Sequence, residues 1–156
     1  MAINTTIDLL QALHRSMSGI RKAPNLAKYP TVIDTADLPF VIAWPSDGQF
    51  AIKGGGFKQS HRTYRVLVYV EPIGQNDIPS RAVAAVALLQ TMLNAYISAA
   101  NVPLADPTST NPYQVTIESG PTAPHTDGGI VSNLVFGGKP YHGFEIRLNV
   151  RELWST

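Results

Sequence analysis

A cluster of three glycines beside a lysine is the first feature of the sequence that suggests binding chemistry. Residues 54–56 are all glycine and are followed by Phe57 and Lys58. Glycine-rich loops that hold phosphate have the spacing G-x-x-x-x-G-K-[ST] after a strand and before a helix. Here a strand is expected after the glycines, and neither Ser nor Thr follows Lys58. The cluster is therefore interpreted as the tip of a hairpin rather than as a phosphate loop.

The four histidines lack the spacings of known metal motifs. No two of them stand in an H-x₃₋₅-H or H-E-x-x-H arrangement. His125 and Asp127, two residues apart, form one close pair of potential ligands, which alone is a weak signal. The chain has no cysteine, which excludes thiolate sites and disulfides. We therefore expect no metal and no other cofactor.

No sequence pattern indicates nucleophilic catalysis. The chain has no G-x-S-x-G element around a serine, no cysteine, and no clustering of its acidic residues. We therefore expect that the protein is not an enzyme, and a small enzyme whose site assembles from distant residues stays as a third hypothesis.

Basic residues are concentrated in residues 15–65. This segment holds eight of the twelve Lys and Arg residues and three acids, Asp34, Asp37 and Asp47. A basic patch is able to contact nucleic-acid phosphates, so a nucleic-acid-associated protein that uses this segment is the alternative function. The net charge of +1 is far from that of a dedicated nucleic-acid binder, which favours a solvated surface.

The composition suits a single domain with extensive contacts. A chain of 156 residues fits one domain, residues 1–156. Charged residues make up 15% of it, against about 25% in ordinary globular domains. The N-terminus lacks the basic and apolar regions of a signal peptide, which predicts a cytoplasmic protein.

A charge-free segment, residues 82–105, dominates the middle of the chain and predicts one long helix over residues 79–100. Pro79 suits the first turn. Polar side chains interrupt the apolar run, so a membrane span is rejected. Because an exposed helix face usually carries charges, we expect a loop or another subunit to cover part of the outer face. The apolar stripe expected to face the core is Val83, Val86, Leu89, Met92 or Leu93, Tyr96 and Ile97.

A shorter helix is expected near the N-terminus. Thr5 is the expected N-cap, with Asp8 in the capping-box position. Gly19 is expected to end the helix in the left-handed conformation. Residues 21–37, which contain two prolines and no periodicity, are interpreted as an extended arm or loop.

Alternating apolar residues predict five strands, over residues 38–45, 63–70, 113–118, 130–136 and 144–151. The loops at 46–62 and 120–129 are expected to protrude from the domain. In the second strand, Tyr64, Val66, Val68 and Val70 face one side and form the expected bed for the long helix. This order predicts an α+β fold with a mainly antiparallel sheet, on which the long helix and the N-terminal helix pack.

Four local patterns follow one another along the chain. The first helix runs into Ser18-Gly19-Ile20, and Asp37-Leu38-Pro39-Phe40-Val41-Ile42 follows a proline-rich link. Tyr64-Arg65-Val66-Leu67-Val68-Tyr69-Val70 precedes the long helix, and the expected last strand is Gly143-Phe144-Glu145-Ile146-Arg147-Leu148-Asn149-Val150. Together these patterns resemble the tail terminator proteins of long-tailed bacteriophages, and the last strand is similar to that of the family. The related tail-completion and head–tail joining proteins share much of this fold, and the two roles stay open.

The resemblance implies a structural protein of the virion tail or neck, assembled in the host cytoplasm. Such proteins form a homohexameric ring that caps the tail tube, ends its polymerisation and joins the tail to the head connector or stopper protein. DNA passes through the lumen of the ring, and no membrane is involved. The residues expected to contact the ring or the tube are Lys53, Gly54, Gly55, Gly56, Phe57, Lys58, His125 and Asp127.

Deleting residues 54–56 tests the expected role of the hairpin tip. We expect abnormal tail lengths or a loss of infectious particles, because the tip would no longer reach the ring or the tube. Electron microscopy of tails and counts of infectious particles measure the effect. Normal tails together with normal infectivity would contradict the role assigned to the tip.

Overall fold

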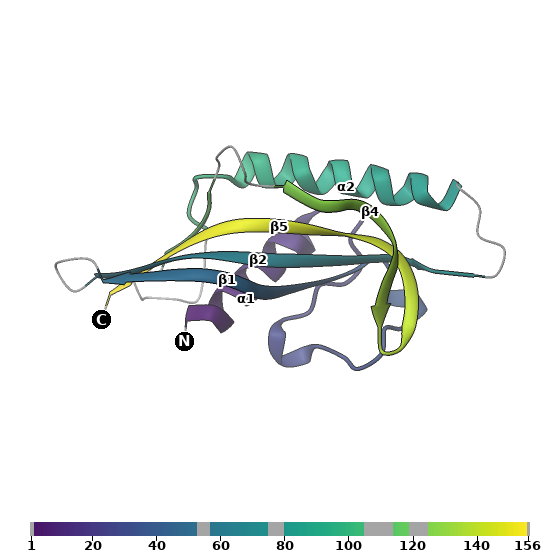
Figure 1. Cartoon of the computed structure of the whole chain (residues 1–156), viewed down its shortest axis with the longest axis horizontal. Coiled ribbons are helices and arrows are strands. Elements are labelled where there is room, and N and C mark those ends of the chain that lie inside the picture. The colour runs from purple at the N-terminus through teal and green to yellow at the C-terminus, as the bar shows by residue number, and fades with distance from the viewer. Residues whose placement is uncertain (1, 53–56, 75–79, 105–113, 119–124, 156) are drawn as a thin grey trace.

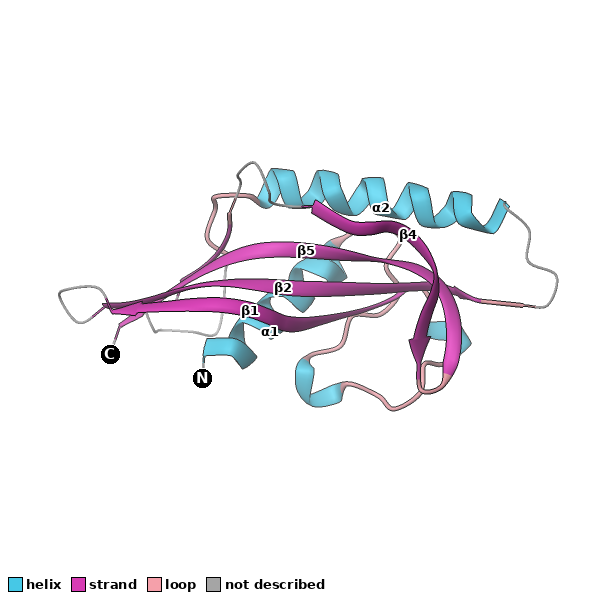
Figure 2. Ribbon diagram, viewed as in Figure 1, coloured by secondary structure: helices cyan, strands magenta, loops and turns pink. Residues whose placement is uncertain are grey.

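The computed structural model describes residues 2–52, 57–74, 80–104, 114–118 and 125–155, and in them it confirms the α+β fold with an antiparallel sheet. Figure 1 and Figure 2 show the sheet with its two α-helices. The elements are α1 (Ala2–Ser16), β1 (Phe40–Ile52), β2 (Phe57–Pro72), α2 (Ser80–Ala99), β3 (Gln114–Ile117), β4 (His125–Phe136) and β5 (Lys139–Ser155). Two short 3₁₀ helices, η1 (Leu26–Lys28) and η2 (Thr35–Asp37), interrupt the arm between α1 and β1.

The sheet is built around β5, which pairs along both of its sides. The strand order is β1-β2-β5-β3, and β4 also pairs with β5. The partner of β3 is the segment of β5 that ends at Leu153, whereas β4 pairs with the segment that begins at Lys139. Every pairing between the named strands is antiparallel. Because β2, β3 and β4 all pair with β5, their registers on β5 decide which of their side chains lie next to one another.

The β1–β2 hairpin is longer than expected. The sequence predicted a loop over residues 46–62, but pairing continues to Ile52, which lies opposite Lys58. Pro45 and Gly48 flank a shift in register. A proline is tolerated there because β1 is an edge strand, and the bulge absorbs the irregularity. The hairpin extends beyond both helices at one end of the molecule (Figure 1).

One face of the sheet carries the main core, and both helices pack on it. The expected bed for α2 is confirmed, since Tyr64, Val66 and Val68 are completely buried and Val70 almost so. The same cluster takes Leu10 from α1 and Val41 and Ala43 from β1, together with these buried residues of α2 and β5: Leu88, Met92, Tyr96, Phe144, Ile146, Leu148 and Val150.

The expected start of α1 is wrong. The helix begins at Ala2, so Thr5 lies inside it and is not its N-cap. The Asp8 carboxylate accepts a hydrogen bond from the backbone N–H of Leu26, at 3.0 Å, instead of closing a capping box. Gly19 does adopt the left-handed conformation, with φ of +91°. A side chain there would be strained and would also lie 3.2 Å from Leu88 of α2.

The existence of α2 is confirmed, but part of its expected core stripe is wrong. Val83, Val86 and Ile97 are 65%, 47% and 64% exposed. The buried side consists of Ala85, Leu88, Met92 and Tyr96. Apolar residues recur at helical spacing on both sides of α2, so the spacing alone does not identify the buried side. The small Ala85 lets the helix approach the sheet closely. Neither described helix is long and apolar enough to cross a membrane.

A second, smaller core lies on the opposite face of the sheet. Phe40 and Tyr69 alternate with residues of the main core, so their side chains point the other way. They pack with Tyr141 of β5 and Ile33 of the arm. Phe136 adds edge-to-face ring contacts, with its centroid 5.3 Å from that of Tyr69 and 6.0 Å from that of Phe40. This cluster covers one end of the second face.

A buried chain of hydrogen bonds joins the two helices to the arm and to β1. The side-chain nitrogen of Gln11 donates to the carbonyls of Pro24 and Val41, at 2.8 and 2.9 Å. Its oxygen therefore accepts from Nδ1 of His14, at 2.8 Å. This assignment leaves Nε2 of His14 as the acceptor for the Tyr96 hydroxyl, at 2.6 Å. The network requires a neutral imidazole, and burial lowers the pKa of His14 from 6.5 to about 3.

The pKa of His14 predicts a loss of stability in mild acid. Below its ordinary pKa of 6.5 the residue takes up a proton in the unfolded chain but not in the folded one, so the free energy of unfolding falls as the pH falls. Between about pH 7 and about pH 5, the protonation of His14 in the unfolded chain lowers the free energy of unfolding by about 2 kcal/mol. Urea unfolding at the two pH values measures the difference.

A matched pair of variants isolates the contribution of His14. His14→Gln removes the titrating group, whereas His61→Gln removes an exposed histidine. We expect the pH dependence to disappear in the first variant and to persist in the second. Equal stability of the unmodified protein at the two pH values would contradict the assignment of a neutral buried histidine.

Candidate functional site

The structure separates the residues predicted from sequence to contact a ring or a tube. Residues 53–56 lie outside the described residues. Phe57 and Lys58 start β2, where they pair with Ser155 and Trp154 of β5. The expected loop at 120–129 is wrong for residues 125–129, His125 and Asp127 among them, because they belong to β4. Residues 120–124 lie outside the described residues. His125 lies opposite Arg147, and Asp127 falls in an irregularity between Thr126 and Ile130.

One histidine makes an exposed pair with a carboxylate. Nδ1 of His61 lies 2.7 Å from Oε1 of Glu118, and its Nε2 contacts Gln59. A His–Glu pair is able to act as a general base when a nucleophile stands beside it. Thr63, two residues along the same strand, instead donates to Asn149 at 3.1 Å. Among the described residues, no group of three or more potential ligands is able to hold a metal ion.

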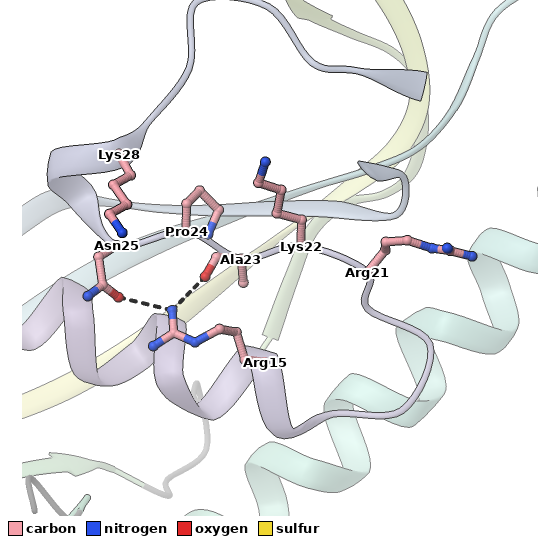
Figure 3. A pocket seen from close by; sticks show the side chains of 7 residues that line it. All are labelled: Arg15, Arg21, Lys22, Ala23, Pro24, Asn25 and Lys28. Atoms are coloured by element: carbon pink, nitrogen blue, oxygen red, sulfur yellow. Dashed lines mark hydrogen bonds between the residues drawn. The ribbon is translucent and has the colours of Figure 1, made fainter. Parts of the chain in front are cut away.

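Four basic residues line a hollow of about 380 Å³ beside the arm (Figure 3). They are Arg15 from the end of α1 and Arg21, Lys22 and Lys28 from the arm. Two of the four have structural partners. Nη1 of Arg15 donates to the Ala23 carbonyl at 2.7 Å and to Asn25 at 2.9 Å, and Lys22 pairs with Asp37 at 2.9 Å. Arg21 points away from Arg15 in Figure 3.

The rest of the basic segment divides between the two faces of the sheet. Arg62 shares the parity of the buried Tyr64, and its Nε lies 3.8 Å from the buried carboxylate of Glu152. Arg65 has the opposite parity and pairs with Glu145. Residues 15–65 therefore form no single basic patch among the described residues.

A row of register partners crosses the second face of the sheet beyond its aromatic cluster. Trp44 of β1 lies opposite Arg65 of β2, Arg65 lies opposite Arg147 of β5, and Arg147 lies opposite His125 of β4. Trp44 is 51% exposed. We call this arrangement the arginine row. Sequence reasoning missed it, because its members are spread over four strands and only the register brings them together.

The outer face of α2 is an exposed surface without charged residues after Arg81. It presents the exposed Val83, Val86 and Ile97. The exposed residues between and beside them are Ala84, Ala87, Gln90, Thr91, Asn94 and Ser98. No Lys, Arg, Asp or Glu occurs in this helix after Arg81. An apolar surface without charges is typical of a protein contact.

The arm covers the edge of β1 near the helices. The Tyr29 hydroxyl donates to the Ala43 carbonyl at 2.8 Å and accepts from the Ala43 N–H at 3.0 Å. The N–H of Val41 donates to the Lys22 carbonyl at 2.9 Å. Burial raises the pKa of Tyr29 to about 12, so the hydroxyl keeps its proton. The covered part of the edge is not available for pairing with another strand.

No protein-family model matches this chain, and no curated protein matches it significantly.

Tyr29→Phe tests the cover of the β1 edge. The variant leaves the N–H and C=O of Ala43 without the hydroxyl, and we expect the free energy of unfolding to fall by about 1–2 kcal/mol. Amide exchange at Ala43 should become faster, while that of Val41 should stay slow because the Lys22 carbonyl still covers it. Unchanged exchange at Ala43 would show that the hydroxyl does not protect this edge.

Proposed function

We propose that this chain is a structural assembly protein of a phage tail or neck. Identical subunits form a ring that caps the tail tube, ends its polymerisation and joins the tail to the head connector. The proposal takes the partners from the resemblance of the sequence to tail terminator proteins. The observation that carries it in the structure is the exposed, charge-free outer face of α2.

The outer face of α2 has the composition of a surface that is covered in the working form. Val83, Val86 and Ile97 do not contribute to the core of the subunit. A helix that only faced water would gain solubility from Lys or Glu at these positions. A contact with a neighbouring subunit explains why apolar and uncharged residues stand there instead.

The shape of the molecule also supports an adaptor role. The β1–β2 hairpin extends beyond the helices (Figure 1), and its projecting half is paired strand rather than loop. A paired hairpin is stiffer than a free loop and is able to reach a neighbouring ring. When two different surfaces of the subunit contact each other head to tail, each subunit is rotated relative to the one before it. The subunits form a closed ring when a whole number of these rotations makes a full turn.

The mechanism that follows is steric. One face of the ring fits the last ring of the tail tube. The opposite face presents no tube-like surface, so no further tube subunit is added. The head connector or stopper protein binds that opposite face, and DNA passes through the lumen. This mechanism needs only shape and contact surfaces.

Charged substitutions on α2 test the proposal. Val86→Lys and Ile97→Lys add charges at exposed positions, so the fold of the subunit should be unaffected. The unmodified protein is expected to form particles near six times 16.9 kDa, either alone at high concentration or on the tail tube of its phage. The double variant should stay smaller and should not limit tube length. Native mass spectrometry and electron microscopy of growing tubes measure both effects.

Val32→Lys with Val135→Lys is the matched control, because it adds the same two charges at residues that are 67% and 62% exposed but lie on the arm and on β4. It should assemble and cap tubes normally. Equal loss in the control and in the α2 variant would mean that a general increase in charge, not the α2 face, prevents assembly. A chain that stays monomeric and leaves tube length unchanged, with and without tube protein, would overturn the proposed function.

A further inference from the structure

We propose that the basic hollow beside the arm binds the phosphate group of a small soluble molecule, such as pyrophosphate or a nucleotide. The hollow lies between the end of α1 and the arm, and its volume is about 380 Å³. That volume is in the range of pockets that hold small molecules. Arg15 and Lys28 are the phosphate ligands. Because all lining residues belong to one subunit, the site does not require ring formation.

The arm leaves few hydrogen-bond acceptors open to a ligand in the hollow. Four successive carbonyls of the lining already accept hydrogen bonds from within the subunit, at distances between 2.7 and 2.9 Å. The carbonyls of Lys22, Ala23, Pro24 and Asn25 accept from Val41, Arg15, Gln11 and Lys28, respectively. Lysine and arginine side chains only donate. The hollow is therefore suited to a ligand that mainly accepts hydrogen bonds, as a phosphate group does.

Arg15 is held in place before a ligand binds. Its Nη1 donates to the Ala23 carbonyl at 2.7 Å and to Oδ1 of Asn25 at 2.9 Å (Figure 3). Both acceptors are uncharged, so these bonds orient the guanidinium group without neutralising it. They do not use Nε and Nη2, and such a planar pair of donors suits an oxyanion. Among the described residues, no carboxylate forms an ion pair with Arg15.

Lys28 supplies the second positive charge. Its backbone N–H donates to the Asn25 carbonyl at 2.9 Å, and its side chain extends toward Asn25 in Figure 3. No carboxylate of the described part of the chain forms an ion pair with Lys28. Asn25 therefore links the two ligands, because its side chain binds Arg15 and its backbone binds Lys28.

The other two basic residues of the lining contribute less. Lys22 pairs with Asp37 at 2.9 Å, and Arg21 points away from Arg15 in Figure 3. Their charges act on an anion in the hollow over a longer distance, at which salt screens them more strongly. Arg21 is exposed and therefore offers a control with the same change in charge as Lys28.

The acidic residues of α1 and the arm do not neutralise the hollow. These segments hold four basic residues and three acids, Asp8, Asp34 and Asp37, an excess of one positive charge. None of the three acids lines the hollow. Asp37 is paired with Lys22, and Asp8 and Asp34 accept from backbone N–H groups, at 3.0 Å each. The excess positive charge is therefore concentrated at Arg15 and Lys28.

The lining favours a small phosphate over a nucleic acid or a carboxylate. None of the lining residues is aromatic, so the bases of a nucleic acid would find no stacking surface. A terminal phosphate presents three acceptor oxygens and carries up to about two negative charges. It is therefore able to accept from Arg15 and Lys28 together, whereas a carboxylate has one charge and two oxygens.

The experiment titrates pyrophosphate into the protein at about 50 mM salt, without divalent cations, and follows the N–H signals by NMR. We expect shifts at residues 23–28 and at Nε–H of Arg15. Lys28→Gln should weaken binding about tenfold, the effect of losing one charge-assisted hydrogen bond. The control Arg21→Gln should weaken it by less than about twofold, and Lys28→Arg should retain most of the binding.

Two further arms identify the source of the phosphate and separate this site from the proposed function. Equal affinity for pyrophosphate and adenosine diphosphate means that phosphate alone is recognised, whereas tighter binding of the nucleotide places the nucleoside in the hollow as well. Both results support the proposal. The α2 double variant, which is expected not to assemble, should show the same shifts. A failure of ring formation and a failure of this site are therefore separate results.

Several outcomes would overturn the proposal. These are no shifts up to about 10 mM pyrophosphate, shifts confined to residues outside 15–28, or an equal loss of binding in Lys28→Gln and Arg21→Gln. Malonate that binds as tightly as pyrophosphate would show that phosphate is not selected. A DNA duplex that displaces pyrophosphate at a lower concentration of phosphate groups would identify a nucleic acid as the occupant instead.

Discussion

The buried hydrogen-bond chain through Gln11, His14 and Tyr96 is the interaction on which the arrangement of the helices depends. It joins α1 to α2 directly, and through the Gln11 amide it also fixes the arm at Pro24 and the edge of β1 at Val41. Each polar atom of this hydrogen-bond network is either a donor or an acceptor. The amide nitrogen of Gln11 donates twice, so its oxygen is the acceptor for His14. Loss of one partner leaves a buried polar group unsatisfied, which costs about 1–3 kcal/mol. The network therefore selects one arrangement of four segments that apolar packing alone would leave less defined.

The two faces of the sheet differ in composition because of that arrangement. With both helices held on one face, β2 and β5 alternate between a side that is apolar at 64, 66, 68 and 70 of β2 and at 144, 146, 148 and 150 of β5, and a side that changes along the strand. The changing side is aromatic where the arm and β4 cover it and charged where the strands are open. The arm also places Tyr29 against the edge of β1 beside Trp44. The position of the exposed tryptophan is thus set by the same segment that the buried network holds.

The sequence predicted the fold more successfully than it predicted the surfaces. The alternation of side chains identified the buried side of β2 correctly. Tyr64, Val66 and Val68 are all completely buried, as expected when every second residue of a strand faces the core. The side of α2 was partly misassigned, since apolar residues occur on both of its sides and the buried position at Ala85 is small. The hairpin was underestimated because Pro45 and Gly48 suggest a loop, whereas an edge strand with a bulge accommodates both. The arginine row is a product of register between distant strands, which local patterns do not contain.

The exposed side chains of α2 also set a limit on how the proposed ring would form. Complete burial of an aliphatic side chain contributes about 1.5–3 kcal/mol, and Val83, Val86 and Ile97 are already partly shielded. Three such residues therefore contribute about 3–6 kcal/mol to one contact, whereas association alone costs about 4–15 kcal/mol. Over most of this range the cost exceeds the gain, so these three side chains alone hold two subunits together only weakly. Ring closure, in which each subunit makes two contacts, or docking on a tube that holds several subunits at once raises the effective concentration and shifts that balance. Under the proposed function, this weakness is useful, because subunits would remain dispersed until a finished tube provides the template.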